Sequence, residues 1–522
     1  MHFFTEIFIE LVAYNININM LAKRSISILV LTATGILFSF SLQKKWQSKF
    51  VTSSKDGSLK YIPDEKGNII PDFSRVGFYG GDKPIPGIAV AKTVSPTGTG
   101  NDQATIQAAI DEVTKMPLDK NGYRGTVLLT KGTYKIAESI HINASGIVLR
   151  GEGDATKLVA TAKKQVSLID VEGKGNITEV KGTRTKALDE YIPTGTFAIT
   201  VTSAVNFSAG DKIIVFRPGT DEWIKDLKMD QIEGREGTKQ WQAKEYDFSF
   251  ERLITKVEGN KIFIDNPIVM PMETKYGGAE IFKYNFEGRI NNVGVEDLYC
   301  ESEFETDTSE NHGWDAISFN KVEQGWVRNV TAKYFGYSCV NLGGSAKNIS
   351  VLNSNCFDHK SVITGGRRYS FCNNGQLNLF MNCHTTDGRH DYVTGARTCG
   401  PNVFYNCTAA KTHADIGPHH RWSMGTLYDN ITTDGEINIQ DRGNWGSGHG
   451  WAGVTQVVWN CAVKKAAIQN PWASGKNYCI GLKGEKYDGR LKGRSDAAWE
   501  GQNKEGLQPE SLYMAQLKAR KK

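Results

Sequence analysis

Basic side chains recur at fixed distances from a repeated asparagine in the second half of the chain. Six asparagines separated by 24, 29, 24, 24 and 30 residues mark the repeat: Asn329, Asn353, Asn382, Asn406, Asn430 and Asn460. Seven and fifteen residues after successive markers lie two trios of basic residues: Lys360, Arg389 and His413, then Arg368, Arg397 and Arg421. If each repeat forms one coil, each trio forms a column with members about 5 Å apart. Cations this close repel one another, so the pattern predicts an anion lying across them.

Histidines and tryptophans concentrate in the same repeats. Eight of the ten histidines lie at or after His312, and eight of the eleven tryptophans lie at or after Trp314. Four of the histidines lie beside arginines in adjacent repeats: His390, His413, His419 and His420. The aromatic faces of Trp422 and Trp445 are candidates to stack on sugar rings, with buried loop anchors as the alternative interpretation.

A basic groove of this kind suits an acidic polysaccharide, and uronic-acid chains are cleaved without water by β-elimination. A base removes the proton at C5, a cation neutralises the carboxylate, and the glycosidic oxygen leaves C4. The base must be unprotonated, as a histidine is near neutral pH and as a lysine becomes when neighbouring positive charge lowers its pKa. We predict that Lys360 or His413 is the base and that His390 or His420 donates the proton.

The remaining candidates bind the substrate or a metal. Arg389, Arg397 and Arg421 are predicted to hold carboxylate or sulfate groups, with Arg421 also counted as catalytic. Further predicted substrate contacts are Arg368, His419, Trp422, Arg442 and Trp445. Asp391 and Asp415 are candidate calcium ligands, because hard cations prefer oxygen ligands.

The repeat also predicts the elements that position these side chains. A period of about 24 residues is typical of a solenoid in which each coil buries its apolar face against its neighbours. Cys383, Cys407 and Cys461 directly follow their markers, which predicts an internal column. They are interpreted as small buried hydrophobic residues, with a disulfide as the less favoured alternative. The predicted fold is all-β: a right-handed parallel β-helix with an antiparallel β insertion and short capping helices.

The N-terminal part of the repeat region carries a family resemblance. Residues 102–111 are predicted to form a helix, and residues 126–129, 134–136 and 147–149 to form strands. Segments 102–111, 127–134 and 149–153 resemble the N-terminal entry of pectate-lyase-like proteins. The resemblance implies a single-stranded right-handed parallel β-helix and, for many members, β-elimination with Lys or Arg as base and often with calcium. No complete active-site motif of a lyase family is present, so no catalytic residue is transferred from the family.

The chain divides into an export signal with an over-extended N-terminus (1–45), an extension (46–94) and the β-helix domain (95–522). The insertion is expected at about 190–290 and a C-terminal capping helix at about 509–520. Lys23 and Arg24 precede an apolar run at 26–38, which indicates secretion to the periplasm or the medium, with an uncleaved membrane anchor as the alternative. No later run reaches the ~18 apolar residues of a spanning helix, so no other membrane contact is expected.

Composition narrows the classes of function. A net charge of +5 over 522 residues excludes a dedicated nucleic-acid binder, and 39% hydrophobic residues exclude a disordered chain. The favoured function is a polysaccharide lyase acting on an acidic substrate. The alternatives are a glycoside hydrolase that uses Asp391 and Asp415 as its carboxylate pair, a non-catalytic polysaccharide binder, and a uronate epimerase.

Overall fold

The computed structural model describes residues 45–522. The chain divides into two compact units, residues 1–46 and residues 47–522, and the second unit is described here. The predicted export signal lies outside the described residues. Within 45–522, no helix is long and apolar enough to cross a membrane.

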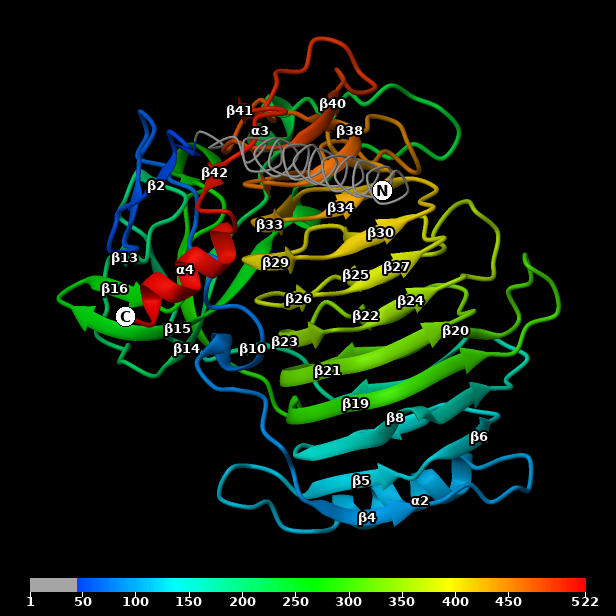
Figure 1. The fold of residues 1–522 in the computed structure, drawn as a ribbon. Coiled ribbons are helices and arrows are strands. Elements are labelled where there is room, and N and C mark those ends of the chain that lie inside the picture. The colour runs from blue at the N-terminus through cyan, green and yellow to red at the C-terminus, as the bar shows by residue number, and fades with distance from the viewer. Residues whose placement is uncertain (1–44) are drawn as a thin grey trace, which may run out of the picture. The chain divides into compact units, whose positions relative to one another are not determined.

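Residues 47–522 contain a parallel β-helix, as the sequence predicts (Figure 1). Each strand pairs in parallel with the strand one coil later, for example Phe380 with Phe404 and Phe404 with Tyr428. The strands form three stacks, which we call the A, B and C sheets.

The A sheet begins the coils. Its strands are β4 (Val90–Val94), β5 (Gly125–Leu129), β8 (Ile147–Ala160), β19 (Ile290–Ser302), β21 (Val322–Lys333), β23 (Lys347–Leu352), β26 (Leu379–Met381), β29 (Asn402–Tyr405), β33 (Thr426–Asp429), β37 (Val457–Trp459), β39 (Tyr478–Ile480) and β41 (Ala498–Glu500). The B sheet takes the second parts of β8, β19 and β21, together with β6 (Gly132–Ile136), β24 (Asn355–Phe357), β27 (His384–Thr386), β30 (Thr408–Ala410), β34 (Thr432–Thr433), β38 (Ala462–Ile468) and β40 (Lys483–Lys486).

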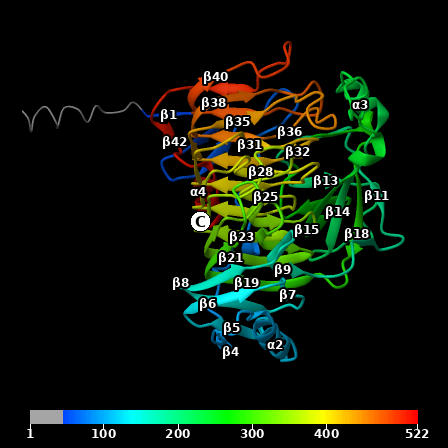
Figure 2. The ribbon, with the colours of Figure 1, turned by 90° about the vertical axis from the view of Figure 1, so that its right-hand side faces the viewer.

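The C sheet faces the viewer in Figure 2. Its strands are β7 (Ile140–Ile142), β9 (Val166–Glu172), β20 (Gly313–Asn320), β22 (Ser338–Leu342), β25 (Phe371–Asn373), β28 (Tyr392–Thr394), β31 (Asp415–Pro418), β35 (Glu436–Ile439) and the end of β38. A two-stranded pair, β32 (Ser423–Met424) with β36 (Gly453–Val454), lies in the loops that lead from the C sheet back to the A sheet.

The marker asparagines make the turn from the A sheet to the B sheet. All six have left-handed backbone angles, with φ between 49° and 56°, a conformation that asparagine tolerates better than most residues. Their amides bond along the axis: Asn353 Nδ2 donates to Asn329 Oδ1 at 3.3 Å, Asn382 to Asn353 at 3.2 Å, and Asn406 to Asn382 at 2.7 Å. The repeat is therefore confirmed as one coil per marker.

The interior is a continuous apolar column. Cys383, Cys407 and Cys461 are buried in it, and all nine cysteines, which lie in the described part of the chain, are free. The ring centroids of Phe380 and Phe404 lie 4.8 Å apart, and those of Phe404 and Tyr428 lie 5.5 Å apart. The interpretation of the cysteines as buried small hydrophobic residues is confirmed.

An antiparallel sheet is inserted between β9 and β19. Its strands are β10 (Thr178–Glu179), β11 (Thr185–Lys186), β13 (Ala198–Thr200), β14 (Lys212–Arg217), β15 (Phe248–Glu258), β16 (Lys261–Ile264) and β18 (Glu280–Asn285). The connection from β14 to β15 carries α3 (Asp221–Asp226), whose Trp223 is fully buried. The insertion core also contains Trp422 and Trp451, which come from loops beside the C sheet, so the insertion packs against those loops (Figure 2).

Two helices border the solenoid. α2 (Gln103–Thr114) covers the N-terminal end with the buried side chains Ile106, Ala109, Ile110 and Val113, whereas α4 (Leu512–Arg520) lies along the flank of the A sheet (Figure 1). The remaining short elements are β1 (Trp46–Gln47), β2 (Val51–Ser53), β3 (Leu59–Tyr61), β12 (Tyr191–Ile192), β17 (Met272–Glu273), β42 (Leu507–Gln508), η1 (Phe78–Gly81), η2 (Ala243–Tyr246) and η3 (Thr274–Tyr276).

Candidate functional site

Four histidines from three consecutive coils meet at the loops around β28, β31 and β35. His390 precedes β28, His419 and His420 follow β31, and His449 lies in the long loop after β35. The ring centroids lie 4.5 Å apart for His390 and His419, 5.1 Å for His419 and His449, and 4.7 Å for His420 and His449. With the arginines around them, Arg389, Arg397, Arg421 and Arg442, and with Asp415, they form what we call the histidine–arginine cluster.

The loop backbone holds two of these arginines in register. Arg397 N donates to Arg421 O at 2.9 Å, and Arg421 N donates to His449 O at 3.1 Å. Both arginines have left-handed backbone angles, with φ of 58° and 53°. Strained conformations of this kind concentrate at functional sites, because the surrounding structure must enforce them.

The cluster carries more positive than negative charge. Arg442 makes an ion pair with Asp415, and both side chains are buried. The other arginines are held by uncharged acceptors: Arg421 Nη2 donates to Ser447 Oγ at 2.8 Å, Arg397 Nη1 donates to Glu245 O at 2.6 Å, and Arg389 Nη1 donates to a backbone carbonyl. Asp415 is therefore the single carboxylate bonded to these four arginines within the described residues.

Burial and the positive neighbours keep the histidines neutral. Together they lower the pKa of His390 to about 4, that of His420 to about 3 and that of His449 to about 4, and they lower the pKa of His419 as well. After burial and the nearby His449, the charges of Arg421, Arg442 and Arg397 contribute to the lowered pKa of His420. Imidazoles with such low pKa values stay neutral near neutral pH, so each ring keeps an unprotonated nitrogen that can act as an acceptor.

The cluster leaves hydrogen-bonding capacity unused. Buried ring nitrogens without a partner in the described part of the chain are His390 Nε2, His419 Nδ1, His420 Nδ1 and His449 Nδ1, and Arg421 Nε and Arg442 Nε are also unpaired. Each such group costs about 1–3 kcal/mol when it stays unsatisfied. His390 Nδ1 donates to Asp415 O at 2.8 Å, so Nε2 of this ring carries the lone pair.

The four histidines differ in depth. His390 is 1% exposed and packs beneath Tyr369, whose ring centroid is 4.9 Å away. His419, His420 and His449 are half-buried. A ligand from solvent therefore meets these three rings before it reaches His390.

Lys360 and His413 do not join the cluster. Both lie in loops between the B and C sheets, where Lys360 Nζ is 2.9 Å from Asp307 Oδ1 and His413 Nε2 is 3.8 Å from Asp387 Oδ1. Within the described residues, neither side chain makes a hydrogen bond, ion pair or ring contact with the predicted proton donors His390 and His420.

The predicted column of Arg368, Arg397 and Arg421 is wrong at its first member. The coil that follows Asn353 has extra residues before β25, and the pairing of Phe371 with Tyr392 places Arg368 beside Arg389. Arg368 O accepts from Arg389 N at 2.8 Å, and its buried side chain donates to Ser361 O at 2.6 Å. The extra residues in this coil change the number of residues between the marker and the C sheet, while the strands stay paired.

Trp422 is not available for stacking on a sugar, because it is 0% exposed. Its ring centroid lies 4.9 Å from that of Trp223, and its Nε1 donates to Met270 Sδ at 3.3 Å. The alternative interpretation, a buried loop anchor, is correct for this residue. Trp445 is half-buried and lies under Arg442, whose Cζ is 5.7 Å from the ring centroid.

Asp391 and Asp415 do not converge on a metal site. Asp391 Oδ1 accepts from Ser370 Oγ at 2.9 Å and from Thr385 Oγ1 at 3.0 Å, while Asp415 is engaged by Arg442. No group of three or more His, Cys, Asp or Glu side chains within 45–522 is arranged to hold a metal ion. The alternative use of these two carboxylates as a catalytic pair for hydrolysis stays a prediction.

The sequence analysis missed His449 as a site residue. It lies in the coil with the longest step between markers, 30 residues from Asn430 to Asn460. The extra length forms the loop that folds back over His419 and His420. A long step in an otherwise regular repeat was the available signal.

The comparisons with known proteins find distant similarity to solved structures. No protein-family model matches the chain, and no curated protein sequence matches it. Similar solved structures include ORF18 of Geobacillus virus E2 (13% identity, 79% of this chain and 59% of that chain, TM-score 0.41) and tailspike gp49 of Pseudomonas phage LKA1 (15%, 73% and 66%, 0.33). Another is an alginate lyase from Paenibacillus sp. str. FPU-7 (10% identity, 79% and 100%, TM-score 0.37). The chain thus spans less than two thirds of the first two proteins.

Proposed function

We propose that this protein is an exported polysaccharide lyase that binds an acidic polysaccharide at the histidine–arginine cluster and cleaves it by β-elimination. The proposal rests on one observation: neutral histidines with unpaired ring nitrogens lie beside arginines that have few carboxylate partners. A uronate supplies what such a site lacks: an anion for the arginines and an acidic C–H for the base.

His420 and His449, two of the three half-buried histidines, fit the role of base. A carboxylate held by Arg397 and Arg421 has its charge neutralised, which makes the neighbouring C5 proton more acidic. His420 or His449 takes this proton, the electron pair forms the C4–C5 double bond, and the glycosidic oxygen leaves C4. The resulting imidazolium returns the proton to the leaving oxygen. The bound carboxylate also offsets the arginines, so the pKa of the histidine rises when substrate is present.

The deeper residues position these groups. Arg442 is anchored by Asp415, and the carbonyl of Asp415 fixes the tautomer of His390. His390 lies in ring contact with His419, which in turn contacts His420 and His449. The chain of rings thus extends from the buried end of the cluster to its solvent side.

The test is a substrate screen with two readouts. Purified protein is mixed with polygalacturonate, alginate, ulvan and glycosaminoglycans, and both ultraviolet absorbance and new reducing ends are followed. We expect the two signals to rise together on at least one uronate polymer, because β-elimination forms one double bond for each new end. Reducing ends without absorbance would indicate a hydrolase, and binding without either signal would indicate a non-catalytic polysaccharide binder. Either result contradicts the lyase proposal.

A further inference from the structure

A second basic depression adjoins the histidine–arginine cluster. A cavity of about 400 Å³ lies between residues 228–233, which follow α3 in the insertion, and residues 490–494 near the C-terminus. Its third wall includes Asp441, Gly443 and Asn444, the residues on either side of Arg442. The cavity is therefore separated from the cluster by a single loop segment, 441–444.

The walls of this cavity carry uncompensated positive charge. Arg494 is offset by the fully buried Asp441, whose Oδ2 accepts from Arg494 Nη2 at 2.6 Å. Lys228, Arg490 and Lys492 make no ion pair with any described residue, and Glu233 is the other acidic residue of the lining. Three free cations against one free carboxylate make the cavity attractive to an anion.

Aromatic rings accompany these cations. Lys228 Nζ lies 4.7 Å and Arg494 Cζ lies 4.6 Å from the ring centroid of Trp472, a residue of the lining. Arg490 Cζ lies 5.2 Å from the ring centroid of Trp445. An indole ring beside a cation provides a flat apolar surface for a sugar ring and a positive charge for its acidic group.

Arg490 links the cavity to the cluster. Its Nη1 donates to Arg442 O at 2.8 Å and its Nη2 donates to Asn444 Oδ1 at 2.5 Å. Arg442 in turn extends its side chain into the cluster, where it pairs with Asp415. The two basic regions are therefore joined through the 441–444 segment.

We infer that the cavity between residues 228–233 and 490–494 is a second subsite, which binds a carboxylate or sulfate group on the same polysaccharide chain that occupies the histidine–arginine cluster. This inference rests on the proposed function and adds a role for the insertion: it forms one wall of the subsite. The protein consequently binds long acidic chains more tightly than short ones.

The test compares the double variant Lys228→Ala/Lys492→Ala with the control Lys60→Ala/Lys181→Ala. The control removes two exposed lysines that line neither basic region. Binding is measured by calorimetry with oligogalacturonates, oligomannuronates and heparin oligosaccharides of two and eight sugar units. We expect the variant to lose about five- to twentyfold in affinity for the eight-unit ligands, to bind the two-unit ligands as the wild type does, and the control to match the wild type throughout. Loss on the eight-unit heparin ligand alone would assign the subsite to sulfate, and equal loss on all three eight-unit ligands would assign it to the shared anionic chemistry.

Three results would overturn the inference. If the variant binds the eight-unit ligands as tightly as the wild type does, the cavity contributes no subsite, while the proposed function stands. If the control loses as much affinity as the variant, general electrostatic attraction explains the effect. If the wild-type protein binds none of the ligands at either length, the proposed function and the subsite fail together.

Discussion

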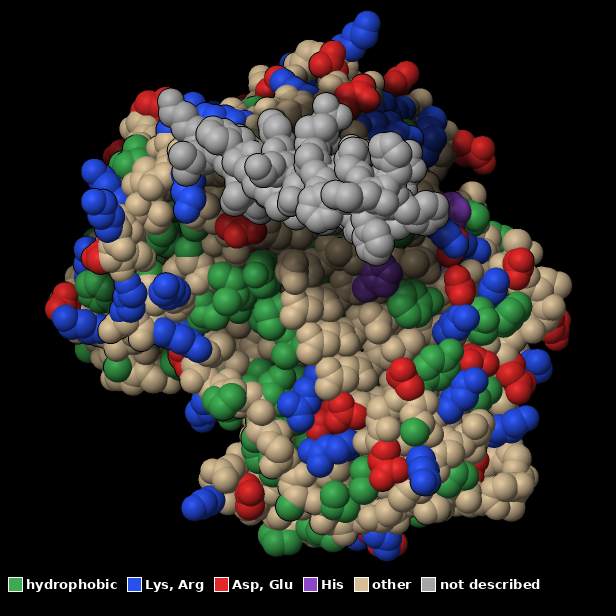
Figure 3. Space-filling model, in the orientation of Figure 1, with side chains coloured by type: hydrophobic (Ala, Val, Ile, Leu, Met, Phe, Trp, Pro, Cys, Tyr) green, Lys and Arg blue, Asp and Glu red, His purple; other side chains and the backbone are tan. Residues whose placement is uncertain are grey.

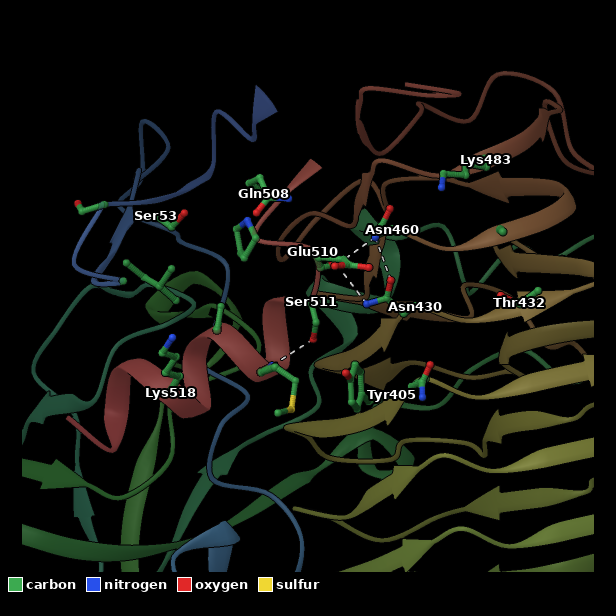
Figure 4. Close-up of a pocket in the computed structure, with 18 residues that line it drawn as sticks. Ser53, Tyr405, Asn430, Thr432, Asn460, Lys483, Gln508, Glu510, Ser511 and Lys518 are labelled. Atoms are coloured by element: carbon green, nitrogen blue, oxygen red, sulfur yellow. Dashed lines mark hydrogen bonds between the residues drawn. The ribbon is translucent and has the colours of Figure 1, made fainter. Parts of the chain in front are cut away.

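The side-chain amides of the six marker asparagines, which we call the asparagine ladder, and the histidine–arginine cluster are built by the same repeat. They differ in whether their polar groups have hydrogen-bond partners. In the ladder, Asn460 Nδ2 donates to Asn430 Oδ1 at 2.9 Å, and both amides also donate to the carbonyl of Glu510 at the start of α4 (Figure 4). In the cluster, no imidazole bonds to the next one, and each ring keeps an unpaired nitrogen.

The difference follows from the groups themselves. An amide has both a donor and an acceptor, so identical residues stacked on one another can satisfy each other, as Asn329 to Asn406 and Asn430 to Asn460 do. Arginine only donates, and a stack of arginines and neutral histidines needs acceptors from elsewhere. A satisfied stack is complete as a structural element, whereas an unsatisfied one with excess positive charge fits the anionic ligand that we propose.

The surroundings agree with this contrast. A cavity of about 690 Å³ lies beside the ladder and is lined partly by Tyr405, Lys483 and Lys518, but the ladder amides that border it are already bonded (Figure 4). Across the A and B sheets, acidic and basic side chains are largely interspersed (Figure 3).

The largest effect should come from removing a half-buried histidine. We expect His420→Ala or His449→Ala to lower kcat/KM on the preferred polymer by about 10²- to 10⁴-fold, the usual contribution of a positioned general base. The matched control is His384→Ala, a histidine on β27 in the B sheet. If both cluster variants keep wild-type rates, the cluster is not the site of the reaction.

Removing an arginine of the cluster should have the next largest effect. Arg421→Ala is expected to raise KM and reduce kcat, by about 10- to 100-fold in kcat/KM, because charge-assisted hydrogen bonds contribute about 1.5–3 kcal/mol. Steady-state kinetics would be compared with those of Arg75→Ala, a partly exposed arginine whose Nη1 lies 3.8 Å from Asp82 Oδ2. Equal kinetics for the two variants would argue against carboxylate binding by Arg421.

A change in the ladder should affect stability rather than turnover. Asn406→Ala removes its bond to Asn382 and places alanine at φ 51°, so we expect a loss of about 1–3 kcal/mol in the free energy of unfolding. Asn406→Gly tolerates this backbone angle and should lose less. Urea denaturation measures the free energy of unfolding of both variants. A fall in kcat of the folded Asn406→Ala protein would contradict a purely structural role for the ladder.

The smallest effect is a pH dependence of stability that originates in the cluster. The pKa values of His390, His420 and His449 fall from 6.5 to about 4, about 3 and about 4 on folding, so the unfolded chain binds more protons below pH 6.5. Their stabilising contribution is complete above pH 6.5 and is lost as the pH falls toward 4 and 3. Melting temperatures between pH 7 and 4 should drop less steeply for His449→Gln than for the wild type, and parallel curves would contradict the lowered pKa values.

Much of the fold was predictable because the repeat is local. The spacing of the asparagines specified the coils, and the cysteines after Asn382, Asn406 and Asn460 were correctly placed in the interior. The same spacing failed for Arg368, because a loop insertion moves the residues after it relative to the marker while the strands stay paired. Counting from a marker is accurate only up to the first loop of variable length.

The sequence by itself determined the solenoid, the turn at each asparagine and the repeats that carry the basic side chains. The tertiary structure alone decided that His449 joins His419 and His420, that Trp422 packs into the insertion, and that Lys360 and His413 lie elsewhere. The physical reason is that strand pairing follows a period encoded in each coil, whereas the direction of a loop side chain depends on loop length and on contacts with segments hundreds of residues away.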